Sequence, residues 1–327
     1  MANAEALANA EALATAEDTR AATRLGAGGP AARVRVPVRP GLSAGVLLRA
    51  CRPRQWAKNV LVLAAPCAAG VATRPRVALE VLAAFVVFCM LSSATYLIND
   101  VRDREQDRRH PRKRMRPVAA GELSPTAALW SAGAIGLAGI AIATAVRPAL
   151  GAVGCGYLAL TASYSLWWRH IVVADIVAIA AGFVLRAVAG GVATDIPLSR
   201  WFLLVTSWCA VFLVAGKRYA EVNEVATNAR TRTTLRSYSA GHLRLLLLLA
   251  AAFASGAYAM WAFTRPEHGL WYEPSMVLFV LWLARYGVLL GRGVGQAPEE
   301  LILRDRVLLA LSLTWALLFL GGVYVGR

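Results

Sequence analysis

A run of acidic and amide side chains, Asn99 to Asp107, follows directly on an apolar stretch long enough to cross a bilayer. Its aspartates, Asp100, Asp103 and Asp107, are three and four residues apart, so at ~100° per residue they fall on one face of a helix. On a solvated surface helix these like charges would repel one another, whereas a shared Mg²⁺ needs such a set of oxygens. The motif therefore predicts a Mg²⁺ site that binds a diphosphate at a membrane surface, with Asn99 adding a neutral oxygen ligand.

Cationic side chains follow the acidic motif within a few turns. Those that we expect to bind the anionic substrate are Arg112, Lys113 and Arg114. Only three of the 35 basic residues are lysine, namely Lys58, Lys113 and Lys217, and each lies in a polar segment at the end of an apolar run. An ammonium group binds phosphate as a compact point charge, so these lysines are candidate phosphate ligands. The alternative is that their positions arise by chance in an arginine-rich chain.

Two further polar clusters flank other apolar runs and are expected to converge with the acidic motif on one cavity. Gln55, Lys58 and Asn59 precede the first run, and Lys217, Arg218 and Tyr219 follow the sixth. Each cationic side chain alone is also typical of a snorkelling anchor or a topology signal.

Asp175 and Arg186 lie inside an otherwise apolar segment, residues 171–192. Ionised groups within a span are costly and normally face a polar cavity or a partner. Eleven residues make about three helical turns, so the two side chains share a face but lie ~16 Å apart along the axis. We expect Asp175 to join the catalytic carboxylates or to bond a substrate hydroxyl, and Arg186 to meet a phosphate. The alternative is a structural ion pair with another span.

The composition is typical of a polytopic all-α membrane protein. The chain has 327 residues, of which 58% are hydrophobic, and a mean hydropathy of +0.53. Its net charge of +16 is spread over short segments between apolar runs, which argues against nucleic acid as a partner. The cysteines show no Cys-x-x-Cys spacing, so neither a zinc site nor a disulfide framework is indicated.

The hydropathy pattern predicts a bundle of nine transmembrane helices. They cover roughly residues 57–73, 78–98, 125–146, 149–167, 171–192, 201–216, 242–264, 274–291 and 307–325. With a cytoplasmic amino terminus, the arginine-rich loops fall on the cytoplasmic side, as the positive-inside rule requires. We therefore expect a multi-pass protein of the plasma membrane whose active site faces the cytoplasm.

The chain divides into two parts. Residues 1–44 contain a repeated hexapeptide, Asn-Ala-Glu-Ala-Leu-Ala, followed by a segment rich in glycine and proline, which is typical of a disordered low-complexity tail. Residues 45–327 form the predicted catalytic membrane domain. The tail lacks the pattern of a secretory signal peptide.

These motifs resemble the UbiA superfamily of intramembrane prenyltransferases, whose Asn-Asp-x-x-Asp-x-x-x-Asp motif is matched by Asn99, Asp100, Asp103 and Asp107. Within it the chain is most similar to the branch that transfers phosphoribosyl groups to polyprenyl phosphates. The segments that carry this likeness are 52–59, 99–103, 110–114, 116–121, 182–193, 216–221 and 303–307. In typical superfamily members a second aspartate pair follows the fourth span, but here Ile179 stands at the second position of that pair.

The resemblance implies a nine-span fold, Mg²⁺ dependence and two anionic substrates. The donor in that branch is phosphoribosyl pyrophosphate, the acceptor is decaprenyl phosphate or a similar polyprenyl phosphate, and the product feeds the synthesis of the arabinan in the cell wall. A homo-oligomer is also implied. Two alternatives stay open: a UbiA-type enzyme that prenylates an aromatic acceptor, against which Ile179 argues, and a transporter with a polar site around Asp175 and Arg186.

Overall fold

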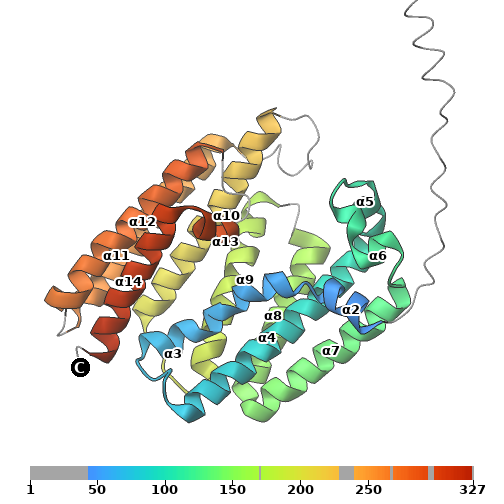
Figure 1. The fold of residues 1–327 in the computed structure, drawn as a ribbon, viewed down its shortest axis with the longest axis horizontal. Coiled ribbons are helices and arrows are strands. Elements are labelled where there is room, and N and C mark those ends of the chain that lie inside the picture. Colours follow the sequence, from blue (N-terminus) through green and yellow to red (C-terminus); the bar gives the residue numbers. More distant parts are fainter. Residues whose placement is uncertain (1–42, 169–170, 228–238, 266–267, 294–297, 326–327) are drawn as a thin grey trace, which may run out of the picture. The chain divides into compact units, whose positions relative to one another are not determined.

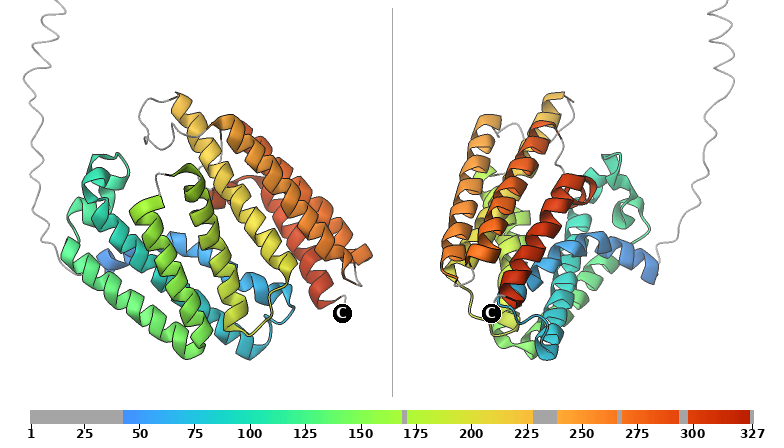
Figure 2. Two further views of the ribbon diagram at one scale, coloured as in Figure 1. Left: turned by 180° about the vertical axis from the view of Figure 1, so that it is seen from behind. Right: turned by 60° about the vertical axis from the view of Figure 1, so that its left-hand side comes forward.

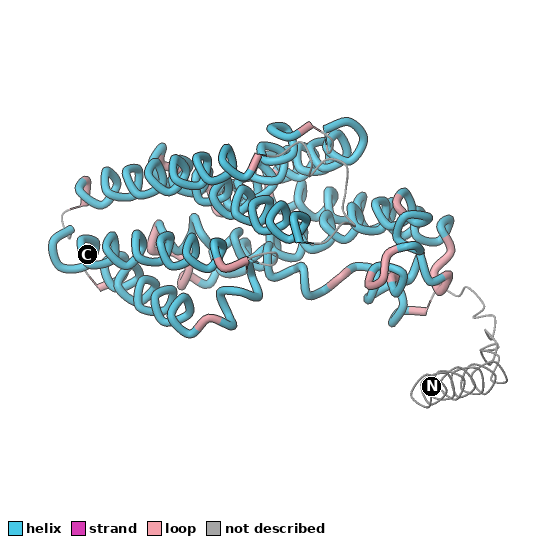
Figure 3. Tube along the Cα trace, turned by 90° about the horizontal axis from the view of Figure 1, so that it is seen from above, coloured by secondary structure: helices cyan, strands magenta, loops and turns pink. Residues whose placement is uncertain are grey.

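The computed structural model describes residues 43–168, 171–227, 239–265, 268–293 and 298–325, and these form helices without a strand (Figure 3). The all-α fold class is therefore confirmed. Of the predicted tail, residues 1–42 lie outside the described residues, so the domain boundary near residue 44 stays a prediction.

Eight of the nine predicted spans are helices long and apolar enough to cross a membrane. Six of them are single α-helices. The span after α7 continues from α8 into a π-helical turn, η3 (Tyr164–Trp168), and the span that ends with α12 begins in a π-helical turn, η5 (His268–Tyr272). The α-helices are α4 (Pro75–Arg102), α7 (Pro125–Val146), α8 (Pro148–Ser163), α9 (Val172–Ala193), α10 (Arg200–Thr227), α11 (Ala240–Phe263), α12 (Glu273–Gly291) and α14 (Arg306–Tyr324).

The first predicted span, 57–73, is not a single α-helix. The chain passes from α2 (Ala44–Cys51) through Arg52, which has a left-handed backbone, into a 3₁₀-helix, η1 (Pro53–Leu63), and a short α3 (Ala64–Ala68). A 3₁₀-helix has three residues per turn and rises ~2.0 Å per residue, so η1 and α3 together extend ~30 Å, about the thickness of the apolar core of a bilayer. The count of nine crossings therefore stays a prediction.

The burial of η1 follows the three-residue period. Asn59 and Val62 are fully buried and Trp56 lies on the same side, where it donates to Ser93 of α4 over 3.1 Å. Lys58 lies on a second, half-buried side, one turn after Gln55. The 3₁₀ geometry thus gives Lys58 and Asn59 separate environments although they are adjacent in the sequence.

The acidic motif lies where one helix ends and the next begins. Asp103 follows the last residue of α4 with φ −91° and ψ 8°, and α5 (Arg104–Arg109) starts directly after it. The chain then turns through η2 (Lys113–Met115) and α6 (Pro117–Ala120) and reverses at Gly121, whose φ is 83°. The single uninterrupted helical face expected from the sequence is therefore broken at Asp103.

The long helices pack in two groups. In the first, α4, α7, α8 and α9 enclose an apolar core with η1, and in the second, α10, α11, α12 and α14 enclose another (Figures 1 and 2). The remaining elements of the second group are η5 (His268–Tyr272) and α13 (Pro298–Arg304). Apolar side chains between α9, α10 and α11 join the two groups. The end of α4 and the start of η1 pack in a further apolar cluster with α2, α6 and α7.

Gly190 allows α9 to approach the backbone of η1. A Cβ atom at this position would lie 1.8 Å from the carbonyl oxygen of Val62, which is a backbone atom that cannot swing away. We expect Gly190→Ala to destabilise the protein by ~1–3 kcal/mol because this contact must open. Thermal unfolding of the purified protein in detergent measures the effect.

Gly156→Ala on α8 is the matched control, since no atom lies within 4 Å of the position that its added Cβ would take. This variant should unfold at the parent temperature or slightly above it, because alanine favours helix. Equal unfolding temperatures for the two variants would show that the close approach of α9 to η1 is unimportant.

Candidate functional site

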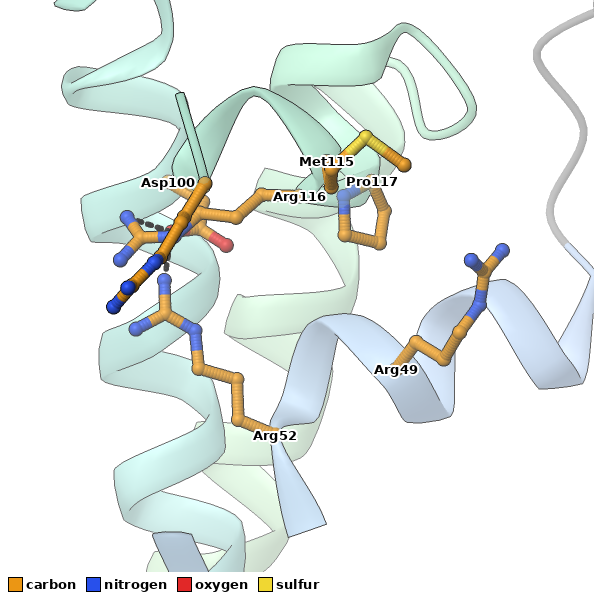
Figure 4. Close-up of a pocket in the computed structure, with 7 residues that line it drawn as sticks. Arg49, Arg52, Asp100, Met115, Arg116 and Pro117 are labelled. Atoms are coloured by element: carbon orange, nitrogen blue, oxygen red, sulfur yellow. Dashed lines mark hydrogen bonds and ion pairs between the residues drawn. The ribbon is translucent and has the colours of Figure 1, made fainter. Parts of the chain in front are cut away.

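Asp100 is the most deeply buried carboxylate of the acidic motif, with a relative exposure of 1%. Its Oδ1 accepts hydrogen bonds from Arg52 and from Arg116, whose Nη1 lies 3.2 Å away. The same Nη1 of Arg116 lies 2.6 Å from Oδ2 of Asp107, which is also buried. One guanidinium group therefore bridges two aspartates of the motif, and a second binds the first of them. Figure 4 shows Asp100 with its two partners, Arg52 and Arg116.

The two arginines reach Asp100 from different segments because of local backbone features. Arg52 lies at the left-handed residue that separates α2 from η1, and Arg116 immediately precedes Pro117, which starts α6. Nε of Arg108 donates a hydrogen bond to the carbonyl of Ala119 over 3.1 Å, which stabilises the turn between α5 and α6. Burial lowers the pKa of the Arg52 guanidinium, and the adjacent carboxylate of Asp100 acts in the opposite direction.

The chemistry of the donor set fits Mg²⁺, which prefers oxygen ligands. Oδ2 of Asp100 is buried and has no hydrogen-bond partner among the described residues, so one carboxylate oxygen is available. The described residues contain no group of three or more His, Cys, Asp or Glu side chains close enough to hold a metal ion. A metal ligated by Asp100 and Asp107 must therefore compete with Arg52 and Arg116, and the metal role of the motif stays a prediction.

A cavity of about 240 Å³ lies over Asp100 and is lined mainly by arginine. Its lining residues are Arg49, Arg52, Asp100, Arg112, Met115, Arg116 and Pro117. The guanidinium group of Arg49 points away from Asp100 and pairs with Glu122 (Figure 4). The structure thus brings Arg112 to the acidic motif as expected, whereas Lys113 and Arg114 do not line this cavity.

A second cavity, of about 190 Å³, lies between α4, α8, α9 and η1. Three predicted site residues line it, namely Lys58, Asn99 and Arg186, together with the aromatic side chains of Tyr96, Tyr157 and Phe183. The side-chain oxygen of Asn99 accepts a hydrogen bond from Ser165 over 2.9 Å. Asn99 and Asp100, adjacent in the sequence, therefore line different cavities.

Asp175 forms a buried ion pair with Arg218 across α9 and α10. Nε of Arg218 donates to Oδ2 over 2.6 Å and Nη2 donates to Oδ1 over 2.9 Å, so the pair is bidentate. The hydroxyl of Tyr164 donates to Oδ1 over 2.8 Å, and Arg218 also binds Glu221 over 2.5 Å. This arrangement favours the alternative interpretation, a structural ion pair, with Arg218 as the partner that the sequence left unidentified.

The other predicted site residues are dispersed. Asn59 is fully buried and accepts a hydrogen bond from Arg186, while Tyr219 packs among apolar side chains of α9, α10 and α11. Gln55 and Lys217 are half-buried and line neither cavity.

The sequence interpretation did not include Arg116 and Tyr157 among its site residues. A tyrosine within an apolar, glycine-containing span and an arginine directly before a helix-starting proline were the available signals. Neither signal shows by itself that the side chain points to the acidic motif or to Arg186.

The chain is similar to known proteins over most of its length. The model of the UbiA prenyltransferase family matches residues 60–309. A decaprenyl-phosphate phosphoribosyltransferase of Corynebacterium glutamicum is 44% identical over 288 residues, covering 85% of this chain and 87% of that protein. The enzyme of that name from Mycobacterium tuberculosis is 45% identical over 280 residues, covering 84% of this chain and 92% of that protein.

The fold also matches that of a solved protein. The structure of a UbiA homolog from Archaeoglobus fulgidus bound to DMAPP and Mg²⁺ superposes with a TM-score of 0.65. It covers 86% of this chain and 99% of that chain at 18% sequence identity, so the likeness is one of fold. Together with the eight apolar helices, these matches identify an integral membrane protein.

The Asp175–Arg218 pair generates a stability prediction. Asp175→Asn leaves the buried guanidinium group of Arg218 with Glu221 as its one carboxylate partner among the described residues, so we expect a loss of about 3 kcal/mol in the free energy of unfolding. The double variant Asp175→Asn/Arg218→Gln removes both charges and should recover part of this loss. Thermal or denaturant unfolding in detergent measures both effects.

Glu80→Gln is the control, because its partner Arg76 is 86% exposed and a surface pair contributes only about 0–1 kcal/mol. If Asp175→Asn unfolds like the parent but has lost turnover, Asp175 acts on the substrate and the structural interpretation is wrong.

Proposed function

The chain belongs to the UbiA prenyltransferase family, and we propose that it transfers the 5-phosphoribosyl group of phosphoribosyl pyrophosphate to decaprenyl phosphate or a similar polyprenyl phosphate. The observation that carries this proposal is the 44–45% identity, over more than four fifths of the chain, to relatives named for that activity. The arginine-lined cavity at the acidic motif supports it, because both substrates are anions.

The reaction breaks one bond and forms one bond at the anomeric carbon of the ribose. The bond to pyrophosphate breaks, the electron pair leaves with the pyrophosphate, and an oxygen of the lipid phosphate bonds to the same carbon. The nucleophile is already an anion, so no general base is needed. None of the described residues that line the two cavities is a histidine that could act as a base, and this reaction does not need one.

The main task of the protein is to bring two anions together. Two unit charges about 4 Å apart repel by roughly 4 kcal/mol at an effective dielectric constant of about 20. Arg52, Arg112 and Arg116 line the first cavity and would bind the pyrophosphate group, since guanidinium groups match phosphate oxygens in pairs. In the structure Arg52 and Arg116 are held by Asp100 and Asp107, which keeps them positioned before the substrate binds.

Asp100 and Asp107, which share Arg116, are the residues that would hold Mg²⁺. Asn99 lines the other cavity, and the part expected of Asp103 stays a prediction. When bound, the ion supplies charge neutralisation for the departing pyrophosphate. Because the aspartates already hold two guanidinium groups, we propose that Arg116 turns from the carboxylates to the phosphate oxygens as the substrate binds. The relative from Archaeoglobus fulgidus, solved with Mg²⁺, supports the choice of metal.

We further propose a location in the plasma membrane with the site open to the cytoplasm. The carboxyl end of α4, the amino end of α9 and the carboxyl end of α10 all carry site residues, and arginine-rich segments follow α4 and α10 in the sequence. The positive-inside rule places such loops in the cytoplasm, where phosphoribosyl pyrophosphate is a soluble metabolite. Assembly into a homo-oligomer stays a prediction.

A two-donor assay tests the proposed function against its alternatives. Purified protein in detergent receives either labelled phosphoribosyl pyrophosphate with decaprenyl phosphate, or labelled prenyl diphosphate with an aromatic acceptor, with and without EDTA. We expect a labelled lipid only from the first pair and only without the chelator. Label in the aromatic product would establish the prenyltransferase alternative, and no transfer from either pair would contradict both enzyme functions.

The buried carboxylate of Asp100 generates a second prediction. Asp100→Asn keeps the shape but removes the charge that orients Arg52 and Arg116 and the oxygen available to a metal. We expect a loss of turnover of at least about 100-fold, typical of removing one electrostatic contact to a transition state. Initial rates of phosphoribosyl transfer measure it.

Glu105→Gln is the matched control, because this acidic residue of α5 is exposed and pairs only with Arg108 among the described residues. Its rate should equal that of the parent. Parent-like turnover by a folded Asp100→Asn variant would contradict the proposed site.

A further inference from the structure

Arg186 is a buried arginine whose hydrogen-bond partners among the described residues are all uncharged. The side chain is 6% exposed and lies in the second half of α9, inside the span. Nε donates to Oδ1 of Asn59 over 2.8 Å, Nη1 to the carbonyl of Gly182 over 2.6 Å, and Nη2 to the hydroxyl of Tyr157 over 2.8 Å. None of these three partners carries a negative charge to balance the guanidinium group.

No ion pair between described residues involves Arg186, in contrast to Arg218 at the end of the neighbouring helix. A buried charge without a counter-ion is costly, and within a span such a residue faces a cavity or a ligand. A guanidinium group has five N–H donors, of which three are used here, one on each nitrogen. Nη1 and Nη2 each keep one N–H group for an anionic ligand.

The neutral partners hold Arg186 in a fixed position. Asn59 is fully buried and its amide nitrogen lies 3.3 Å from Sγ of Cys89 and 3.4 Å from Oγ of Ser92, so α4 orients it. The Tyr157 ring lies against the guanidinium group, whose carbon is 4.8 Å from the ring centroid. A positioned guanidinium group loses little entropy when it binds a planar array of oxygens.

The cavity beside Arg186 has a second cation and a limited volume. Lys58 of η1 also lines it, together with Tyr96, Phe183 and apolar residues of α8 and α9. Its volume of about 190 Å³ is below the ~300 Å³ of a pocket for a whole small molecule. It is sufficient for a phosphoryl group and the carbon atoms next to it.

We propose that this cavity binds a phosphomonoester group of a substrate, with Arg186 and Lys58 as its cationic ligands. The inference rests on the proposed function, which supplies two such groups: the 5-phosphate of the ribosyl donor and the phosphate of the lipid acceptor. A phosphomonoester carries nearly two negative charges at neutral pH, which two cations balance.

The geometry separates this group from the pyrophosphate. Arg52 lines the first cavity and Tyr96 lines the second. The guanidinium carbon of Arg52 lies 5.0 Å from the centroid of the Tyr96 ring. The two cavities therefore adjoin at this contact. Two anionic groups bound on either side of it are held apart, each with its own cations, which lowers their mutual repulsion.

The test measures how the parent, Arg186→Lys and Arg186→Gln bind pairs of substrates that differ only in one phosphate group. Full-length protein in detergent is titrated with four probes: phosphoribosyl pyrophosphate, ribose 1-pyrophosphate, decaprenyl phosphate and decaprenol. We expect Arg186→Gln to weaken the binding of one phosphorylated probe by about 10- to 100-fold, the range for a hydrogen bond to a charged group. The same variant should bind the matching probe without the phosphate as the parent does.

The pair of probes that shows this difference identifies the source of the phosphate. Arg186→Lys should bind this probe more tightly than Arg186→Gln does, because lysine keeps the positive charge but lacks the paired N–H donors of a planar guanidinium group. Arg200→Gln is the matched control, since Arg200 also lies against an aromatic ring, that of Trp201, but is exposed at the start of α10. Equal binding of all four probes by Arg186→Gln and the parent, at unchanged unfolding temperature, overturns the proposal.

Inorganic phosphate separates this inference from the proposed function. If the parent transfers no phosphoribosyl group, the proposed function is wrong, but phosphate should still raise the unfolding temperature of the parent and of Arg200→Gln. It should not raise that of Arg186→Gln or Lys58→Gln. A phosphate-dependent shift of equal size in all four proteins would show that the cavity is not the phosphoryl site.

Discussion

The burial of Asp100 between two guanidinium groups is the interaction on which the rest of the site depends. A carboxylate that is 1% exposed at the end of a membrane helix is tolerated only because Arg52 and Arg116 neutralise it. These two arginines come from segments on either side of α4 in the sequence. Their convergence fixes the start of η1 and the α5–α6 turn against the end of α4, and it forms the arginine-lined cavity. The same pairing keeps strong phosphate-binding groups in place without a ligand.

The helix bundle supplies a rigid frame for this ion-pair cluster through close backbone contacts. Gly190 brings α9 against η1, and Asn59 of η1 then reaches Arg186 of α9. The 3₁₀ geometry is needed here, because its three-residue period turns Asn59 into the bundle while Lys58 lines the cavity. In an α-helix of the same sequence, residues three apart would be ~60° out of register, so Trp56, Asn59 and Val62 would not share one side of the segment. The irregular first segment is therefore part of the site.

Much of the fold follows from the sequence, since eight apolar runs are long enough to be identified from composition alone. The first span was predicted with the wrong geometry, because hydropathy reports how apolar a segment is and not its helical period. Of the three carboxylates that the acidic motif was expected to gather, Asp100 and Asp107 share Arg116, but the sequence showed neither that α4 ends at Arg102 nor that Arg116 forms this bridge. Such contacts depend on how the α5–α6 turn folds back. Asp175 shows the same limit: its ionised neighbour, Arg218, lies 43 positions away in the sequence.

The distribution of charge explains why the protein separates its cations into two sets. Arginines that are paired with aspartates, such as Arg116, are neutralised and stable without a ligand, and they gain a phosphate only by exchanging partners. Arg186 has no carboxylate partner among the described residues, so an anion that binds it displaces no counter-ion and gains the full attraction of a buried charge. The first set therefore suits a group that must leave after reaction, because the aspartates can take the guanidinium groups back. The second set suits a group that stays attached to its molecule and anchors it throughout the reaction.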